Sequence, residues 1–129
     1  MKWWTTLGLD LIVVLLFATI GRLSHGEAAD PLGILTTAWP FVIALAGVTV
    51  ALIGMQRPTD TWLNGLFVWA GTLGFGMWIR ANWGEGVQAS FVVVAGIFLG
   101  ALMIGWRVIA ARRTTSTGDF EPRRNDPNR

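Results

Sequence analysis

Three stretches of the sequence carry no charged residue, and each is close to the length that crosses a lipid bilayer. They cover residues 31–56, 61–79 and 86–106, and a charged residue flanks each of them at both ends. About 20 residues of α-helix, rising about 1.5 Å each, span the roughly 30 Å of hydrocarbon in a bilayer. We therefore expect three transmembrane helices in this part of the chain.

A fourth apolar stretch, residues 4–22, is less regular because Asp10 interrupts it. A cleavable signal peptide is the alternative interpretation, since Lys2 precedes a short apolar run. Arg22 and His25 follow that run directly, which favours a membrane helix. The sequence thus predicts an all-α polytopic membrane protein, with four transmembrane helices arranged as two tandem hairpins, at about 4–24, 34–55, 61–82 and 87–111.

Composition agrees with one membrane domain, residues 1–111, because 53% of the 129 residues are hydrophobic and only 14% are charged. The remaining segment, 112–129, is polar and contains proline. It buries too little apolar surface to order itself, so we expect a disordered cytoplasmic tail. Much of the chain's positive charge lies there, which is typical of a tail, and we expect no nucleic-acid partner.

Lysines and arginines are distributed unevenly between the two sides of this arrangement. Arg22 and Arg80 lie on one side and eight basic residues lie on the other. Because positively charged loops are retained in the cytoplasm, we expect both termini to be cytoplasmic. The eight residues are Lys2, Arg57, Arg107, Arg112, Arg113, Arg123, Arg124 and Arg129.

The chain resembles itself at an offset of 58 residues, with Arg-x-x-x-Gly-Glu present in both copies. Each copy lies at the outer end of an odd-numbered helix, so the two hairpins are expected to be parallel repeats about a pseudo-twofold axis along the membrane normal. Both arginines should then lie at the same depth. The matching pairs are Trp4/Trp62, Leu15/Leu73, Phe17/Phe75, Arg22/Arg80, Gly26/Gly84 and Glu27/Glu85.

Small residues at i and i+4 allow helices to pack closely. Gly96 and Gly100 have this spacing in the last helix, and Gly47 and Ala51 have it in the second. Contact inside the bundle is the interpretation that we favour, and a homodimer interface is the alternative.

Asp10 lies about one helical turn inside the inner interface, where an ionisable side chain is costly. One interpretation is a proton or cation site that faces the bundle. The interpretation that we favour is pairing near the cytoplasmic surface with Arg57 or Arg107.

A polar cluster is expected at the outer ends of the helices. Two arginines related by the repeat could hold a phosphate or carboxylate, because the planar guanidinium group matches such anions. In the interpretation that the sequence favours, they mark the interface and form salt bridges with the glutamates, and the anion site is the alternative. The candidate ligand-binding residues are Arg22, His25, Glu27, Arg80 and Glu85, with Thr36, Thr37, Gln88 and Ser90 beginning the neighbouring helices.

Pro40, preceded by Trp39, lies in the outer third of the second predicted helix. It either bends this helix beside the polar cluster or marks a helix start near Trp39.

Several classes of chemistry have no support in the sequence. The chain has no cysteine and a single histidine, His25, so thiolate sites and metal sites with two imidazoles are excluded. No nucleophile–histidine–acid order or phosphate-binding glycine loop is present. We expect no metal, no cofactor and no enzymatic activity.

Four sequence segments together are similar to a known family. They are Arg22-Leu-Ser-His-Gly-Glu27, Thr37-Ala-Trp-Pro-Phe41, Arg80 and Gly105-Trp-Arg107. Over roughly residues 7–110 the chain resembles small prokaryotic membrane proteins catalogued as domain of unknown function 3054. The resemblance implies four helices, the cytoplasmic membrane of a prokaryote and no known activity.

Two functions from different classes fit these observations. The first is a small carrier or binding protein for an anionic group or lipid headgroup at the outer face. The second is a non-catalytic accessory subunit of a larger membrane complex. Membrane lipids are the expected partners in either case, together with a second copy of the chain or a larger complex.

Overall fold

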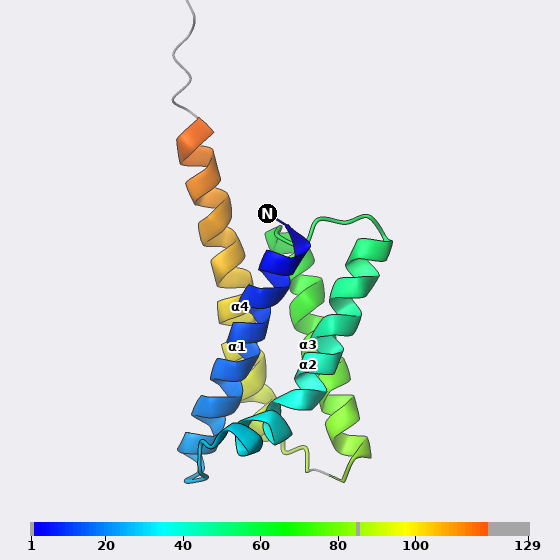
Figure 1. The fold of residues 1–129 in the computed structure, drawn as a ribbon, viewed down its shortest axis with the longest axis vertical. Helices are drawn as coiled ribbons and strands as arrows, with labels where there is room; N and C mark the ends of the chain where they lie inside the picture. The colour runs from blue at the N-terminus through cyan, green and yellow to red at the C-terminus, as the bar shows by residue number, and fades with distance from the viewer. Residues whose placement is uncertain (1, 85, 119–129) are drawn as a thin grey trace, which may run out of the picture.

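Four α-helices make up the computed structural model, which describes residues 2–84 and 86–118 (Figure 1). The helices are α1 (Trp3–Ser24), α2 (Pro31–Gly54), α3 (Trp62–Asn82) and α4 (Ala89–Gly118). All four predicted helices are present, and both ends of α1 and α3 lie within one residue of the predicted positions. The all-α fold class is confirmed.

The start of α2 is encoded locally by Asp30 and Pro31. The Asp30 carboxylate accepts a hydrogen bond of 3.1 Å from the Gly33 backbone N–H, and Pro31 occupies the first helical position. Both are favoured arrangements at a helix start. They begin the helix three residues before the predicted residue 34, which had been chosen from hydropathy.

The far end of α4 lies beyond the predicted boundary. We assigned residues 112–129 to the tail, but α4 continues to Gly118, and residues 119–129 lie outside the described part. Extending an existing helix needs no new nucleation, so polar residues can continue it after the apolar run has ended. Hydropathy therefore indicates where the membrane ends rather than where the helix ends.

Three of the described helices are long and apolar enough to cross a membrane: Trp3–Ser24, Pro31–Gly54 and Ala89–Arg113. The 21-residue α3 is less apolar, partly because it contains several glycines. These glycines allow close packing, since a Cβ at Gly71 would collide with Val48 and one at Gly76 would collide with Phe41. The glycines that make α3 less apolar thus allow it to pack closely against α2.

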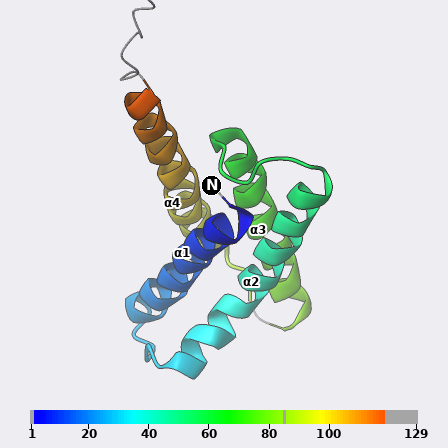
Figure 2. The same ribbon diagram turned by 45° about the horizontal axis from the view of Figure 1, so that its top comes forward.

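The helices form a ring in which sequence neighbours pack together and α1 meets α4 (Figures 1 and 2). The core contains Val14, Phe17, Phe41, Leu45 and Leu99. The outer surface is also apolar, because many large hydrophobic side chains are exposed on it. They include Ile12, Leu16, Ile20, Ile43, Val50, Phe67, Val93, Val94 and Ile97. Such a surface fits lipid rather than water, so the chain is a multi-pass membrane protein.

The ends of α1 and α3 show the internal repeat in three dimensions. α1 ends at Ser24 and α3 ends at Asn82, which differ by the same 58 residues. The next residue has a φ of −96° in one copy and −97° in the other. Gly26 and Gly84 then have positive φ values of 71° and 77°. From the helix end to the glycine, the described residues of the two copies therefore have closely similar backbone conformations.

The glycine pair of α4 is used within the bundle. The Trp69 indole N–H donates a hydrogen bond of 2.8 Å to the carbonyl of Gly96. A Cβ at Gly100 would lie 3.0 Å from the same indole nitrogen. Both glycines thus allow α3 to pack against α4, as we favoured from the sequence. Gly47 and Ala51 of α2 are instead exposed, and a Cβ at Gly47 would meet nothing within 4 Å, so contact inside the bundle is wrong for this pair.

Pro40 is buried inside α2 rather than at its start. It lacks the N–H that would bond to the carbonyl four residues earlier, which favours a bend. Figure 1 shows the first turns of α2 lying across the lower end of the bundle, while the rest runs along it. Of our two interpretations, the bend is the one that the structure shows.

Candidate functional site

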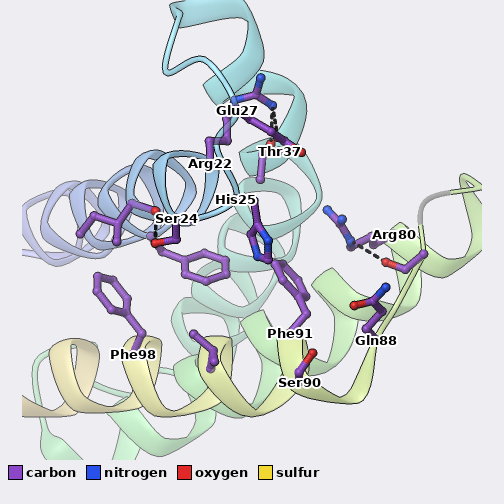
Figure 3. A pocket seen from close by; sticks show the side chains of 15 residues that line it. Arg22, Ser24, His25, Glu27, Thr37, Arg80, Gln88, Ser90, Phe91 and Phe98 are labelled. Carbon is purple, nitrogen blue, oxygen red and sulfur yellow. Dashed lines mark hydrogen bonds and ion pairs between the residues drawn. The ribbon is translucent and has the colours of Figure 1, made fainter.

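A pocket of about 490 Å³ lies where α1 and α3 end and where α2 and α4 begin (Figure 3). Below, we call it the basic pocket. It brings together most of the candidate residues, although they come from all four helices and from the α1–α2 and α3–α4 loops. The polar residues that line it are Arg22, Ser24, His25, Glu27, Thr37, Arg80, Gln88 and Ser90.

The inner part of the basic pocket is apolar. Phe17 of α1 lies between Phe91 and Phe98 of α4, with ring centroids 5.7 Å and 5.9 Å apart. Ile20 and Val94 complete this part of the lining. The pocket therefore has a polar rim and an aromatic floor, a division that a composition count cannot reveal.

Arg22 is engaged mainly by the loop that follows it. Its Nε donates a hydrogen bond of 2.7 Å to the carbonyl of Ala28. Its Nη1 lies 3.1 Å from the carboxylate of Glu27 and donates a hydrogen bond of 3.3 Å to the Thr37 hydroxyl. The predicted salt bridge between Arg22 and Glu27 is confirmed. These contacts hold the α1–α2 loop and the start of α2 against the end of α1.

Arg80 repeats part of this arrangement and adds a contact with the pocket wall. Its Nε donates a hydrogen bond of 3.2 Å to the carbonyl of Gly86, six residues later, as Arg22 does with Ala28. Its guanidinium carbon lies 4.6 Å from the centroid of the Phe91 ring, a cation–π distance. The side chain of Glu85, its predicted partner, lies outside the described residues.

His25 is the C-cap residue of α1, and the chain reverses at Gly26 immediately after it. The Glu27 backbone N–H donates to the carbonyl of Arg22 at 2.9 Å, which closes this turn. In Figure 3 the imidazole of His25 points into the same space as the guanidinium of Arg80, whereas Arg22 is turned toward Glu27 and Thr37. Arg80 and His25 thus point into the pocket together.

The rim has the chemistry of an anion site. Guanidinium, imidazole, amide and hydroxyl groups are all hydrogen-bond donors, and they come together from α1, α3, the α3–α4 loop and α4. Among the lining residues that the structure describes, the charged side chains are two arginines and one glutamate. A planar guanidinium stacked on an aromatic ring is well oriented for a phosphate or carboxylate.

Three supporting residues lie away from the pocket lining. Trp39 packs edge-on against Trp83 with ring centroids 5.5 Å apart, which links α2 to the end of α3. Pro40 is buried beside it in α2. Asp10 lies 12 residues, or about 18 Å of helix, before Arg22. None of the three is among the described residues that line the basic pocket.

Asp10 instead forms a buried ion pair with Arg107 near the opposite end of the bundle. Arg107 Nη1 lies 2.9 Å from Asp10 Oδ1, and Nη2 lies 2.6 Å from Oδ2. The side chains are 0% and 1% exposed for Arg107 and Asp10. Arg107 was one of the two partners that we expected for Asp10, but we did not expect the ion pair to be fully buried.

Further polar groups surround this pair and were missed from the sequence. The Trp106 indole donates to Asp10 at 2.9 Å, and Arg107 donates to the carbonyls of Thr59 at 3.0 Å and Met103 at 2.8 Å. A Cβ at Gly65 would lie 2.7 Å from Arg107 Cδ. We call Asp10, Thr59, Trp106 and Arg107 the inner clasp. Since loop geometry brings Thr59 to Arg107, no spacing in the sequence could have indicated it.

The fold and the pocket together define a small multi-pass helical membrane protein with a basic pocket at one end and a buried ion pair near the other. The model of one protein family matches residues 7–110. This chain belongs to that family, which is described as a protein of unknown function (DUF3054). Comparisons with curated proteins and with solved structures each give no match.

Proposed function

We propose that this chain is a binding protein for an anionic group or lipid headgroup, which it holds in the basic pocket. One observation carries the proposal: Arg80, His25, Gln88 and Ser90 meet at the rim of a single pocket. The stacking of Arg80 on Phe91 orients its guanidinium group there. Arg22 contributes indirectly in this proposal, because it holds the loop that carries His25 in place.

The proposal places the basic pocket on the outer face of the cytoplasmic membrane of a prokaryote. The distribution of basic residues supports this orientation, with eight on the clasp side and two at the pocket. The burial of the inner clasp favours a binding protein over a carrier. A carrier must open at each end in turn, and opening here would expose or separate a buried ion pair.

An accessory subunit is the less favoured function. It was motivated by glycine-rich helix faces that could dock on a partner. Trp69 packs against Gly96 and Gly100 within the bundle. These two glycines therefore do not support docking on a partner.

Replacing Arg80 with lysine tests the proposal. Lysine keeps the charge but loses the planar guanidinium group, so an interface marker would tolerate it and an anion contact would not. We expect Arg80→Lys to weaken the binding of dioleoyl phosphatidylglycerol to the full chain in detergent by about tenfold. Arg57→Lys is the matched control, because Arg57 also stacks on an aromatic ring, Phe67, at 5.5 Å. Equal affinity of Arg80→Lys and the unmodified chain would refute the proposal.

A further inference from the structure

We infer that the basic pocket takes an amphiphile, with the anionic group at its rim and a hydrocarbon chain along its aromatic floor. This inference rests on the function proposed above and specifies the class of ligand. A small anion such as inorganic phosphate needs only the rim. The rim alone does not account for the depth and the apolar lining of the pocket.

The depth follows from the positions of its residues on α4. Ser90 at the rim and Phe98 at the floor both line the pocket. Eight residues separate them, which corresponds to about 12 Å along the helix. This distance is a substantial fraction of one leaflet of a bilayer whose hydrocarbon is about 30 Å thick.

The floor offers aromatic and aliphatic contacts rather than hydrogen-bond donors. Phe17, Phe91 and Phe98 surround it, and Phe17 also packs edge-on against Phe41 with ring centroids 5.6 Å apart. Such an environment accepts methylene groups as the bilayer interior does, whereas a hydrated anion would lose its water there. The floor thus favours an alkyl chain over an anionic group.

The apolar part of the lining is not enclosed. Ile20 of α1 and Val94 of α4 line the pocket and are 46% and 61% exposed. Both positions lie within the apolar parts of their helices. A lipid could therefore place its headgroup at Arg80 and His25 while its chain reaches the surrounding bilayer between α1 and α4.

Gly21 gives a direct way to fill the pocket. It lines the pocket, and a Cβ added to it would meet nothing within 4 Å. Gly21→Leu would therefore place an apolar side chain at the pocket lining from a Cβ that meets no neighbour, and leucine is a better helix former than glycine. Gly8 of the same helix also has nothing within 4 Å and is not part of the lining, so Gly8→Leu is the matched control.

The experiment measures the affinity of the purified full chain for two probes that share a phosphate group. Dioleoyl phosphatidylglycerol, presented in phosphatidylcholine nanodiscs, carries long chains, whereas glycerol phosphate carries none. We expect Gly21→Leu to weaken phosphatidylglycerol binding at least tenfold and to leave glycerol phosphate binding within twofold. Gly8→Leu should change neither affinity.

The other outcomes separate this inference from the proposed function. If Gly21→Leu changes neither affinity while Arg80→Lys weakens both, the hydrocarbon chain of the lipid lies outside the basic pocket. The inference is then overturned and the proposed function stands. If Gly21→Leu weakens both probes equally, the pocket holds only a small anionic group, which also overturns the inference. If Arg80→Lys has no effect on either probe, the proposed function itself fails.

Discussion

Arg107 connects more of the bundle than any other residue described above. Its guanidinium group bonds to Asp10 of α1, to Met103 of α4 and to Thr59 of the α2–α3 loop, and its aliphatic stem lies against Gly65 of α3. A buried charge is tolerated when an opposite charge pairs with it and its hydrogen-bond donors have acceptors. The inner clasp meets these conditions, which points to a structural role.

The clasp predicts a specific pattern of stability in single and double variants. Asp10→Asn or Arg107→Gln should each lower the free energy of unfolding by about 3–5 kcal/mol, because each leaves one buried charge without a partner. The double variant Asp10→Leu/Arg107→Met leaves no buried charge, so its loss should be clearly smaller than the sum of the single losses. Unfolding of the purified chain in mixed detergent micelles measures all three.

Arg57→Gln provides the control for this prediction. Arg57 is exposed near the same end of the bundle and stacks on Phe67. Its loss should change the free energy of unfolding by less than about 0.5 kcal/mol. If the double variant lowers the free energy of unfolding by as much as the two single variants together, Asp10 and Arg107 act independently, which would contradict the prediction.

At the scale of the helices, the matching ends of α1 and α3 are the clearest sign of the repeat. Each helix ends, the chain turns through a glycine with positive φ, and an arginine Nε bonds to a carbonyl six residues later. Residues with a Cβ rarely adopt such φ values, which is why glycine suits both positions. Chance identities between two apolar helices would not produce the same turn twice.

This equivalence predicts equal effects of equal substitutions. Gly26→Ala and Gly84→Ala should each lower the free energy of unfolding by about 1 kcal/mol, because the positive φ is strained for alanine while a Cβ meets no neighbour. Gly86→Ala, at a loop glycine without positive φ, should have almost no effect. Thermal or detergent unfolding of the three variants checks this, and a loss confined to one glycine would contradict the equivalence.

The sequence predicted the helices well because the relevant signals are local. Uncharged runs and the residues that flank them placed α1 and α3 within a residue at both ends. The start of α2 was misplaced although its signal, Asp30 before Pro31, is present in the sequence. The end of α4 could not be read from hydropathy, since a helix can continue into water past its last apolar residue.

The candidate site was only partly predictable, for a physical reason. In a membrane protein, both the interior and the lipid-facing surface are apolar, so hydrophobic periodicity does not separate them. Charged residues such as Arg22 and Arg80 could be located at one end of the bundle. The floor of Phe17, Phe91 and Phe98 depends on how α1 crosses α4, which no local pattern encodes.

At the scale of the whole molecule, the pocket arises where the pseudo-symmetry is broken. The repeat relates the α1–α4 contact to the α3–α2 contact, yet α2 and α3 pack along much more of their length. Gly71 and Gly76 allow that close packing against Val48 and Phe41. The equivalent positions in α1, 58 residues earlier, are Val13 and Ala18. The glycines that allow the close α2–α3 contact therefore correspond to larger side chains in α1, whose contact with α4 is less extensive.

The orientation of the whole molecule predicts which positions react with a membrane-impermeant thiol reagent. The chain contains no cysteine, so single cysteines can be introduced without background. Probes at Ser24 and Asn82, which are exposed at the pocket end, should react in intact cells. Probes at Met55 and Thr117 should react only after permeabilisation. Met55 is 60% exposed and is preferable to the neighbouring Thr59, which is buried in the inner clasp.

The same four probes test whether α3 crosses the membrane, which matters because α3 is not among the three described helices that are long and apolar enough to do so by composition. Met55 and Asn82 lie at opposite ends of the segment that contains α3. If α3 crosses, Asn82 labels from outside and Met55 does not. Labelling of both from the same side would show that α3 does not cross, and Arg80 and Arg22 could not then share a pocket. If all four positions label in the reverse sense, the basic pocket faces the cytoplasm, and its ligand must be sought among cytoplasmic anions and inner-leaflet lipids.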